Sequence, residues 1–193
     1  VDQLIADTSE LDIGLVVANA AASFVGPFVG RSLDTLRTEI DVNVGSTLAL
    51  VHAFVPRLRA RGGGGLVLMS SQSSRRGAPF VANYSATKAY NAILAESLWD
   101  ELSVDGVDVL AGRPGSTRTP GWESSAPQEG IGTANVMGPA DVIPEVFEVI
   151  GRQPSLVPGE ANRDNEALMA TFDRADAVRL VGQVMREMYP PAR

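Results

Sequence analysis

The sequence contains no cysteine, one histidine and, among its 16 basic residues, a single lysine. Without cysteine the chain has no disulfide and no thiolate to serve as a nucleophile or metal ligand. The one histidine, His52, has no cluster of metal-ligand type around it, so we interpret it as a partly buried helix residue and expect no metal site. A signal peptide and a long apolar span are also lacking, which favours a cytoplasmic protein.

Positive charge is scarce as well. The formal net charge is −7 and the isoelectric point lies near 4.7. Because phosphates repel an acidic chain that has no basic stripe, neither nucleic acid nor an anionic membrane is expected as a partner. The chain does have 45% hydrophobic residues in a length of 193, which is enough for one domain, 1–193, with a sizeable core.

The single lysine, Lys88, is the exception in a chain that otherwise uses arginine. One interpretation is that a lysine persists there on a solvated helix face. The other is that the position needs a compact ammonium with three donors, which a planar guanidinium does not replace. Tyr84 lies four residues earlier, so on a helix the two side chains share a face. A neighbouring cation favours the phenolate, and this pairing predicts that the pKa of Tyr84 is lowered toward the working range of an acid–base catalyst.

These two residues follow a strand and a turn. The apolar run at 66–69 predicts a buried strand, followed by a serine-rich turn at 70–74 and a helix over 81–102. Ser71 lies thirteen residues before Tyr84, at the carboxyl end of the strand. Open α/β sheets bind ligands at that end of their strands.

Predicted strands and helices also alternate along the rest of the chain, which predicts an α/β fold with a parallel sheet flanked by helices. The glycines at 62–65 follow a helix and precede a strand, the opposite order from a phosphate-binding loop, so they are predicted to form a helix stop and a turn. One long helix over 32–61 is expected to begin at Ser32. Its apolar residues are expected to form a stripe: Leu33, Leu36, Ile40, Val44, Leu48 and Val51. Further strands are predicted at 13–18, 107–111 and 156–157, and further helices at 140–150 and 164–188.

Ser71, Tyr84 and Lys88, in the pattern S-(x)12-Y-x-x-x-K, resemble the catalytic signature of the short-chain dehydrogenases/reductases. Three flanking segments extend the resemblance over the whole chain. Residues 18–21 match two of the four positions of the family's N-N-A-G segment, and 41–44 read D-V-N-V around Asn43. After the strand at 107–111, residues 114–119 resemble the family's P-G-x-x-x-T segment.

The resemblance implies a Rossmann-like domain that interconverts a carbonyl and a secondary alcohol by hydride transfer with NADP or NAD. In that scheme Tyr84 exchanges the hydroxyl proton, and Lys88 lowers the pKa of Tyr84 and holds the nicotinamide ribose. Ser71 orients the substrate oxygen and Asn43 holds a relay water. The residues implied to bind the cofactor are Asn19, Ala20, Tyr84, Lys88, Pro114, Gly115 and Thr119.

The narrower resemblance is to bacterial reductases of the 17β-hydroxysteroid and 3-oxoacyl reductase type, which implies a small-molecule substrate and a homodimer or homotetramer. The residues at 121–138 correspond to the family's substrate-covering loop, and a mobile lid or a long disordered connection both fit their composition. The alternative to an enzyme is a non-catalytic member that acts as a dimerisation module through its two long helices. Binding of NADPH separates these two classes.

The family's T-G-x-x-x-G-x-G turn, which brings a helix N-terminus to the pyrophosphate, has no counterpart in this sequence. We therefore expect a fold truncated at its amino side, with about 70–80 residues more before Val1 in a complete member. The region that chooses between NAD and NADP would lie there. We also expect the edge at 13–17 to be exposed and the 193-residue chain to be aggregation-prone or partly unfolded. Such a chain is expected to bind NAD(P)H poorly and to show no reductase activity until such a segment is added.

Overall fold

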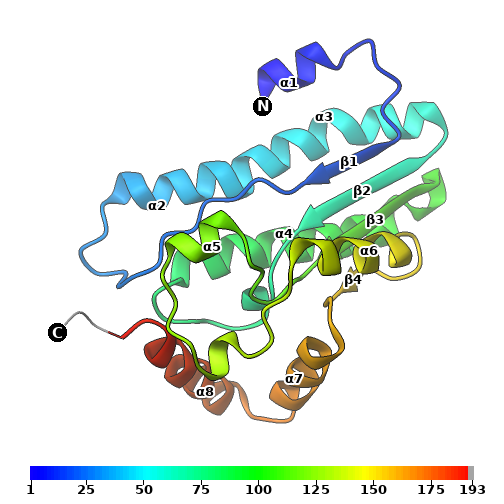
Figure 1. Cartoon of the computed structure of the whole chain (residues 1–193). Helices are drawn as coiled ribbons and strands as arrows, with labels where there is room; N and C mark the ends of the chain where they lie inside the picture. Colours follow the sequence, from blue (N-terminus) through cyan, green and yellow to red (C-terminus); the bar gives the residue numbers. More distant parts are fainter. Residues whose placement is uncertain (191–193) are drawn as a thin grey trace.

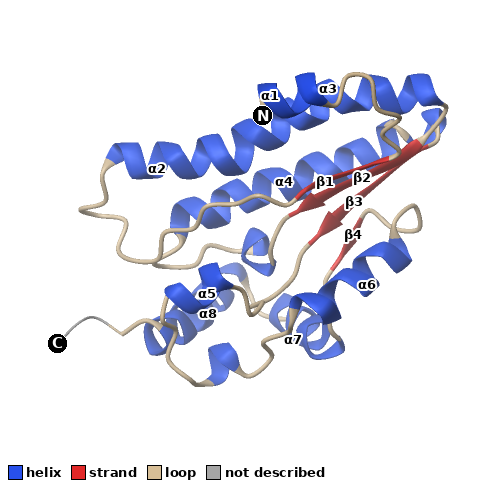
Figure 2. Cartoon of the chain, turned by 45° about the horizontal axis from the view of Figure 1, so that its top comes forward, coloured by secondary structure: helices blue, strands red, loops and turns tan. Residues whose placement is uncertain are grey.

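The computed structural model describes residues 1–190 and contains a four-stranded parallel sheet in the order β1-β2-β3-β4. Leu66 pairs with Val16 on one side and with Val109 on the other, so β2 is a central strand. Helices lie against the sheet (Figure 2), and the predicted α/β class is confirmed. The strands are β1 (Leu15–Ala18), β2 (Gly64–Met69), β3 (Val107–Gly112) and β4 (Ser155–Leu156).

Two apolar clusters hold the helices on opposite faces of the sheet, because side chains alternate along each strand. On one face Leu66 and Val109 pack with Phe54 of α3 and Ala95 of α4. On the other face Val67 of β2 packs with residues of α6. The helices are α1 (Asp2–Asp7), α2 (Leu33–Ile40), α3 (Ser46–Arg61), α4 (Ala82–Glu101), α5 (Pro120–Ser124), α6 (Pro139–Val149), α7 (Glu160–Ala170) and α8 (Arg174–Met188); short 3-10 turns occupy Gln72–Arg75, Ser103–Asp105 and Ile131–Thr133 (Figure 1).

The segment expected to form one long helix is interrupted by a π-helical turn, Asp41–Gly45, between α2 and α3. Ser32 caps its start as predicted, accepting from the backbone N–H of Thr35 at 3.1 Å. The expected apolar stripe is wrong in part, because Leu33, Ile40 and Leu48 are exposed. The side chains that face the interior from this segment are mostly others: Glu39, Asn43, Thr47, Val51, Phe54 and Leu58.

The last predicted helix, 164–188, is also two helices. Residues 171–173 separate α7 from α8, and the side chain of Asp173 accepts from the backbone N–H of Asp176 at 2.9 Å. An aspartate in this position starts a new helix and does not continue the old one. The segment 121–138 contains α5 and a 3-10 turn, and Thr117 forms an isolated parallel bridge with Met137.

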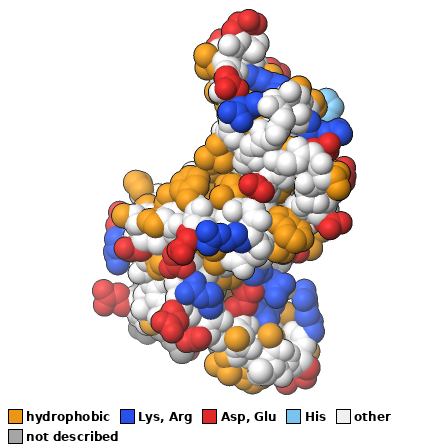
Figure 3. All heavy atoms as spheres, turned by 90° about the vertical axis from the view of Figure 1, so that its right-hand side faces the viewer, with side chains coloured by type: hydrophobic (Ala, Val, Ile, Leu, Met, Phe, Trp, Pro, Cys, Tyr) orange, Lys and Arg blue, Asp and Glu red, His pale blue; other side chains and the backbone are white. Residues whose placement is uncertain are grey.

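The strand β1 lies at an edge of the described sheet, and its outward side chains Leu15 and Val17 are 43% and 41% exposed. This is the exposure that the sequence predicted for this strand. Figure 3 shows apolar side chains in the hollow between the part of the molecule that carries α1 and the part below it. None of the helices in the described part of the chain is long and apolar enough to cross a membrane.

Candidate active site

Ser71, Tyr84 and Lys88 come together at the carboxyl end of β2. Ser71 follows the strand and caps the 3-10 turn after it, while Tyr84 lies in the first turn of α4. The Ser71 side chain lies near the Tyr84 phenol and acts to lower its pKa. One turn further along α4, the Lys88 Nζ lies 5.6 Å from the centre of the Tyr84 ring and donates to the carbonyl of Met69 at 2.8 Å. The structure therefore brings the three predicted residues into one group.

The electrostatics of this group differ from the sequence prediction. Burial raises the pKa of Tyr84, the nearby Ser71 side chain opposes that rise, and the carboxylate of Glu39 adds to it. Burial also lowers the pKa of Lys88 to about 8. The Lys88 ammonium faces the tyrosine ring and the Met69 carbonyl, so the expected lowering of the Tyr84 pKa is not observed. The resting form of Tyr84 is the neutral phenol.

A polar stripe on α4 connects this group to Asn43. Thr87 and Asn91 lie three and seven residues after Tyr84, so they share its face of the helix, and both are buried. Thr87 Oγ1 donates to the carbonyl of Tyr84 at 2.7 Å and accepts from the Asn43 side chain at 2.9 Å. Neither Thr87 nor Asn91 was singled out in the sequence, although the spacing of polar residues at 84, 87, 88 and 91 was a signal for them.

Asn43 lies in the π-helical turn, fully buried, and holds the chain after β1 in place. Its side chain accepts from the backbone N–H of Ala22 at 2.7 Å and donates to the carbonyl of Ala22 at 2.9 Å. Its own carbonyl accepts from the Thr47 hydroxyl at 2.9 Å and from the Asn91 side chain at 3.1 Å. The π turn presents this carbonyl to the side of the helix, toward α4.

Glu39 is a further buried polar residue that the sequence did not indicate. It is 2% exposed, on α2. One carboxylate oxygen accepts from the backbone N–H of Phe24 at 2.8 Å, and the other accepts from the side chain of Asn83 at 2.7 Å. Asn83 is adjacent to Tyr84, so Glu39 fixes the loop after β1 to the helix that carries the phenol.

The residues predicted to bind a cofactor lie at the carboxyl ends of β1 and β3. Asn19 and Ala20 follow β1 and are exposed. Pro114 and Gly115 follow β3, where a Cβ on Gly115 would come within 2.8 Å of a Gln72 oxygen, so the turn tolerates only glycine without a shift. Thr119 caps α5 and accepts from the backbone N–H of Trp122 at 3.2 Å.

A comparison with protein families identifies the chain. The model of the family described as short chain dehydrogenase matches residues 1–130. The chain belongs to the short-chain dehydrogenase family. Members of this family are oxidoreductases that act on alcohol groups and their carbonyl counterparts, with a nicotinamide cofactor.

Individual short-chain dehydrogenases resemble this chain over most of its length. A 7beta-hydroxysteroid dehydrogenase from Clostridium sardiniense is 29% identical over 187 residues, which cover 97% of this chain and 72% of the relative. A solved structure concerned with the stereoselectivity of 7beta-hydroxysteroid dehydrogenase has a TM-score of 0.84 at 26% identity, covering 93% of this chain and 71% of that one. A putative gluconate 5-dehydrogenase from Beutenbergia cavernae, solved with bound NADP, has a TM-score of 0.69 at 25% identity. The match covers 81% of this chain and 68% of that one.

The donor set of the site fits the nicotinamide riboside part of the family's cofactor. Lys88 Nζ is buried and has one protein acceptor for its three N–H donors among the described residues, which leaves donors for a ribose diol. The buried hydroxyls of Ser73 and Ser74, in the serine-rich turn, have no protein partner in the described chain. Buried polar groups normally have a hydrogen-bond partner, so these atoms are consistent with a polar ligand at this end of the sheet.

A cavity of about 660 Å³ lies near the start of α4, lined by the loop after β1, by α5 and by the end of α8. Phe80 lines it, two residues before α4 begins and four before Tyr84. Ser71, Tyr84 and Lys88 do not line it. The structure of this short-chain dehydrogenase therefore offers two features, a polar group on α4 and a cavity of mixed polar and apolar lining near the start of that helix.

Proposed function

We propose that the protein interconverts a carbonyl and a secondary alcohol, with NAD or NADP as cofactor and Tyr84 as the acid–base residue. The observation that carries this proposal is the grouping of the Tyr84 phenol with Ser71, which acts on its pKa, and with Lys88, which is buried one helical turn away. A neutral phenol that lies near a serine hydroxyl is placed to give a proton to an oxygen bound between them.

Each residue has a distinct role in this proposal. In the reductive direction Tyr84 Oη donates its proton to the substrate oxygen as the carbonyl carbon receives a hydride, and Ser71 Oγ hydrogen-bonds to the same oxygen to orient it. The cofactor supplies or accepts the hydride when bound. Lys88 Nζ holds the ribose hydroxyls, and Asn43 holds a water that links the lysine to solvent. Further cofactor contacts are assigned to Asn19, Ala20, Pro114, Gly115 and Thr119.

The raised pKa of Tyr84 supports the reductive direction. At neutral pH the phenol keeps its proton, which makes it an acid toward a carbonyl and a poor base toward an alcohol. Reduction is therefore expected to be the faster direction near neutrality. Oxidation is expected to accelerate as the pH rises and the phenolate becomes populated.

We further propose a hydroxysteroid or its ketone as the substrate class. The 7beta-hydroxysteroid dehydrogenase from Clostridium sardiniense matches nearly the whole chain, and the cavity beside α4 has a volume suited to a rigid, largely apolar molecule. The cavity lining includes Phe24, Val25 and Phe80. These side chains offer apolar surface to a steroid ring system.

A homodimer or homotetramer formed through α3 and α4 is proposed as the assembly. Leu48 on α3 and Ile93 on α4 are 48% and 63% exposed, and both helices cover the same face of the sheet. Burying such side chains against a second copy removes apolar surface from water. The same surface would serve a non-catalytic dimerisation module, so assembly alone does not distinguish that alternative from an enzyme.

The experiment that separates the two functions is a fluorescence titration of NADPH combined with an assay of its oxidation by a 7-ketosteroid. It is carried out with the 193-residue chain and with the same chain preceded by a strand, glycine-rich turn and helix of a complete family member. The enzyme proposal requires cofactor binding and turnover in the extended form, both lost or reduced in the chain alone. Absence of NADPH binding in both forms would favour the dimerisation module.

A further inference from the structure

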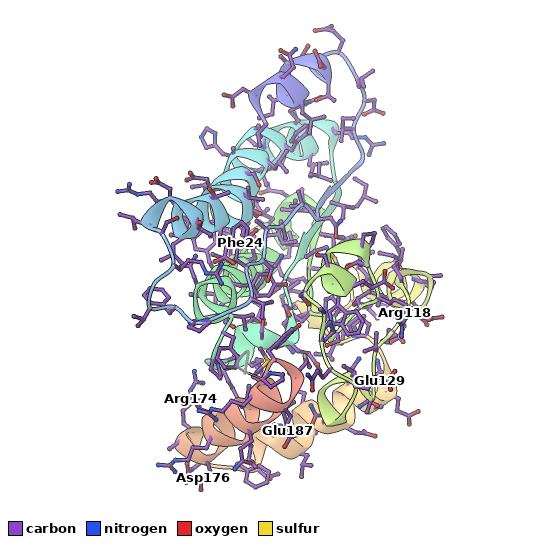
Figure 4. The ribbon with its side chains drawn as sticks, turned by 60° about the vertical axis from the view of Figure 1, so that its left-hand side comes forward. Phe24, Arg118, Glu129, Arg174, Asp176 and Glu187 are labelled. Carbon is purple, nitrogen blue, oxygen red and sulfur yellow. The ribbon has the colours of Figure 1, made fainter. Side chains whose placement is uncertain are left out.

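The cavity beside α4 has a wall whose path is fixed by hydrogen bonds. Along the loop after β1, the backbone N–H groups of Ala22, Phe24 and Gly26 donate to Asn43, Glu39 and the carbonyl of Phe80, at 2.7, 2.8 and 2.8 Å. Every second residue of this stretch is therefore anchored. Phe80 itself has a positive φ of 67°, a conformation that bulky residues rarely adopt and that is held by its surroundings. In Figure 4, Phe24 lies on this loop near the start of α4.

The opposite wall is also tied together. The hydroxyl of Tyr189, after α8, shares a hydrogen bond of 2.9 Å with Ser125, after α5. The backbone N–H of Gln128 donates to the carbonyl of Met188 at 2.9 Å. These bonds join α5 to the end of α8 across a long stretch of sequence. A cavity with two anchored walls is preformed, and such a cavity can bind a rigid ligand at low entropic cost.

Arg31 is the one charged side chain among the described residues that line this cavity. Its Nη2 donates to the carbonyl of Val25 at 2.9 Å, and its guanidinium lies 6.0 Å from the centre of the Phe24 ring. A guanidinium has five N–H donors, and this bond uses one. No carboxylate within residues 1–190 forms an ion pair with Arg31, although the chain carries a formal charge of −7. The cavity thus combines apolar side chains such as Phe24, Val25 and Phe80 with polar ones and a single charged side chain.

We propose that this cavity binds the far end of an elongated apolar substrate that carries a carboxylate or similar anion, and that Arg31 is the residue that recognises the anion. This inference rests on the proposed function, since it places the reacting carbonyl at Tyr84 and the anion at the other end of the molecule. A planar guanidinium forms bidentate hydrogen bonds with a carboxylate, which gives both affinity and orientation. Arg31 is a specificity-determining residue in this view, separate from the group that transfers the proton.

The test compares a ligand that has the anion with the same ligand without it. The probes are 7-oxolithocholate, a ketosteroid with a side-chain carboxylate, and its methyl ester, each titrated into the full chain by calorimetry. We expect the acid to bind at least about tenfold more tightly than the ester. Arg31→Gln is expected to remove this preference by weakening the binding of the acid and not that of the ester. Arg31→Lys is expected to keep part of the preference. Arg37→Gln, which removes an exposed arginine from α2, serves as the control and leaves the preference unchanged.

Three outcomes would overturn the assignment. They are equal affinity of the wild-type chain for acid and ester, no binding of either ligand, and an equal loss of affinity for acid and ester in Arg31→Gln. The wild-type comparison decides the question even if the Arg31→Gln chain does not fold. Tyr84→Phe distinguishes this proposal from the proposed reaction, because that variant is expected to keep the preference for the acid while losing turnover. Preference for the acid without NADPH oxidation by the extended form would reject the reaction and leave the Arg31 site standing.

Discussion

Arg113 and Glu166 form a buried ion pair, with Arg113 Nη2 donating to Glu166 Oε1 at 2.6 Å. Arg113 is 5% exposed and directly precedes Pro114 and Gly115. Arg75, at the end of the serine-rich turn, lies 3.3 Å from the same carboxylate oxygen. One carboxylate on α7 therefore joins the two segments that follow β2 and β3.

Removing that carboxylate leaves a buried guanidinium without its partner. We expect Glu166→Ala to lower the free energy of unfolding by about 3 kcal/mol, because an uncompensated buried charge is far more costly than a lost surface pair. Urea denaturation measures the loss. Glu187→Ala, on the exposed side of α8 (Figure 4), is the control and should change stability by less than about 0.5 kcal/mol. A difference between the two variants of under about 1 kcal/mol would mean that the Arg113 charge is solvated.

Tyr84→Phe keeps the aromatic ring and removes the proton. In the catalytically competent form we expect turnover to fall by more than about 100-fold with cofactor affinity within about twofold of wild type. Steady-state kinetics and NADPH titration measure the two quantities. Activity retained within about tenfold, or some 1.4 kcal/mol in the barrier, contradicts the assignment of Tyr84 as the acid–base residue.

Lys88→Arg preserves the positive charge but not the compact shape. Because the lysine is buried and donates to the Met69 carbonyl, the larger planar group does not fit the same position. We expect weaker cofactor binding together with a lower rate, measured by NADPH titration and single-turnover kinetics. Wild-type kinetics in this variant would show that charge alone is sufficient.

The lowered pKa of Lys88 predicts how stability depends on pH. Its pKa is about 8 in the folded chain and 10.5 as the ordinary value, so between these pH values the unfolded chain binds more protons. The free energy of unfolding should therefore rise with pH in this window, by about 2 kcal/mol between pH 7.5 and 9.5. Urea denaturation at the two pH values measures the rise, and Lys88→Met should abolish it. A rise of equal size in Lys88→Met would assign the effect to other groups.

The exposed edge of β1 predicts self-association of the 193-residue chain. Val17→Lys places a charge on this edge and is expected to increase the monodisperse fraction, because charged side chains on edge strands oppose pairing with another chain. Light scattering after size-exclusion chromatography measures the fraction. Val29→Lys changes a valine that is 90% exposed outside the sheet, and serves as the control. An equal gain from Val29→Lys would point to general solubility and not to the strand edge.

Local signals account for the parts of the fold that sequence reasoning predicted. Ser32 and Gly62 mark helix ends through their own side-chain and backbone chemistry, and the structure places them there. The turn predicted at 62–65 is shorter than expected, because Gly64 and Gly65 already belong to β2. The break at Asp173 was missed because an aspartate inside a helical pattern looks like an ordinary polar residue until its side chain is seen capping Asp176. The apolar pattern of α2 and α3 misled for a similar reason, since the π turn changes which side chains face inward.

The same distinction between local signals and long-range contacts applies to the candidate site. Ser71, Tyr84 and Lys88 could be predicted because they follow a spacing within one segment of chain. Glu39 and Arg31 could not, because their roles depend on residues distant in sequence or on the path of an irregular loop. The raised pKa of Tyr84 likewise results from burial, which cannot be predicted from the spacing of two residues.

The anchoring of the loop after β1 has a consequence for how this protein can change over evolutionary time. Its anchors at 22, 24 and 26 are backbone N–H groups, which every residue except proline provides, while the groups that hold them come from Asn43, Glu39 and Phe80. Apart from Gly26, whose positive φ disfavours other residues, side chains on the loop can therefore be exchanged without altering its path. New ligand preferences can arise by single substitutions there, and the helix that carries the acid–base residue need not be rebuilt.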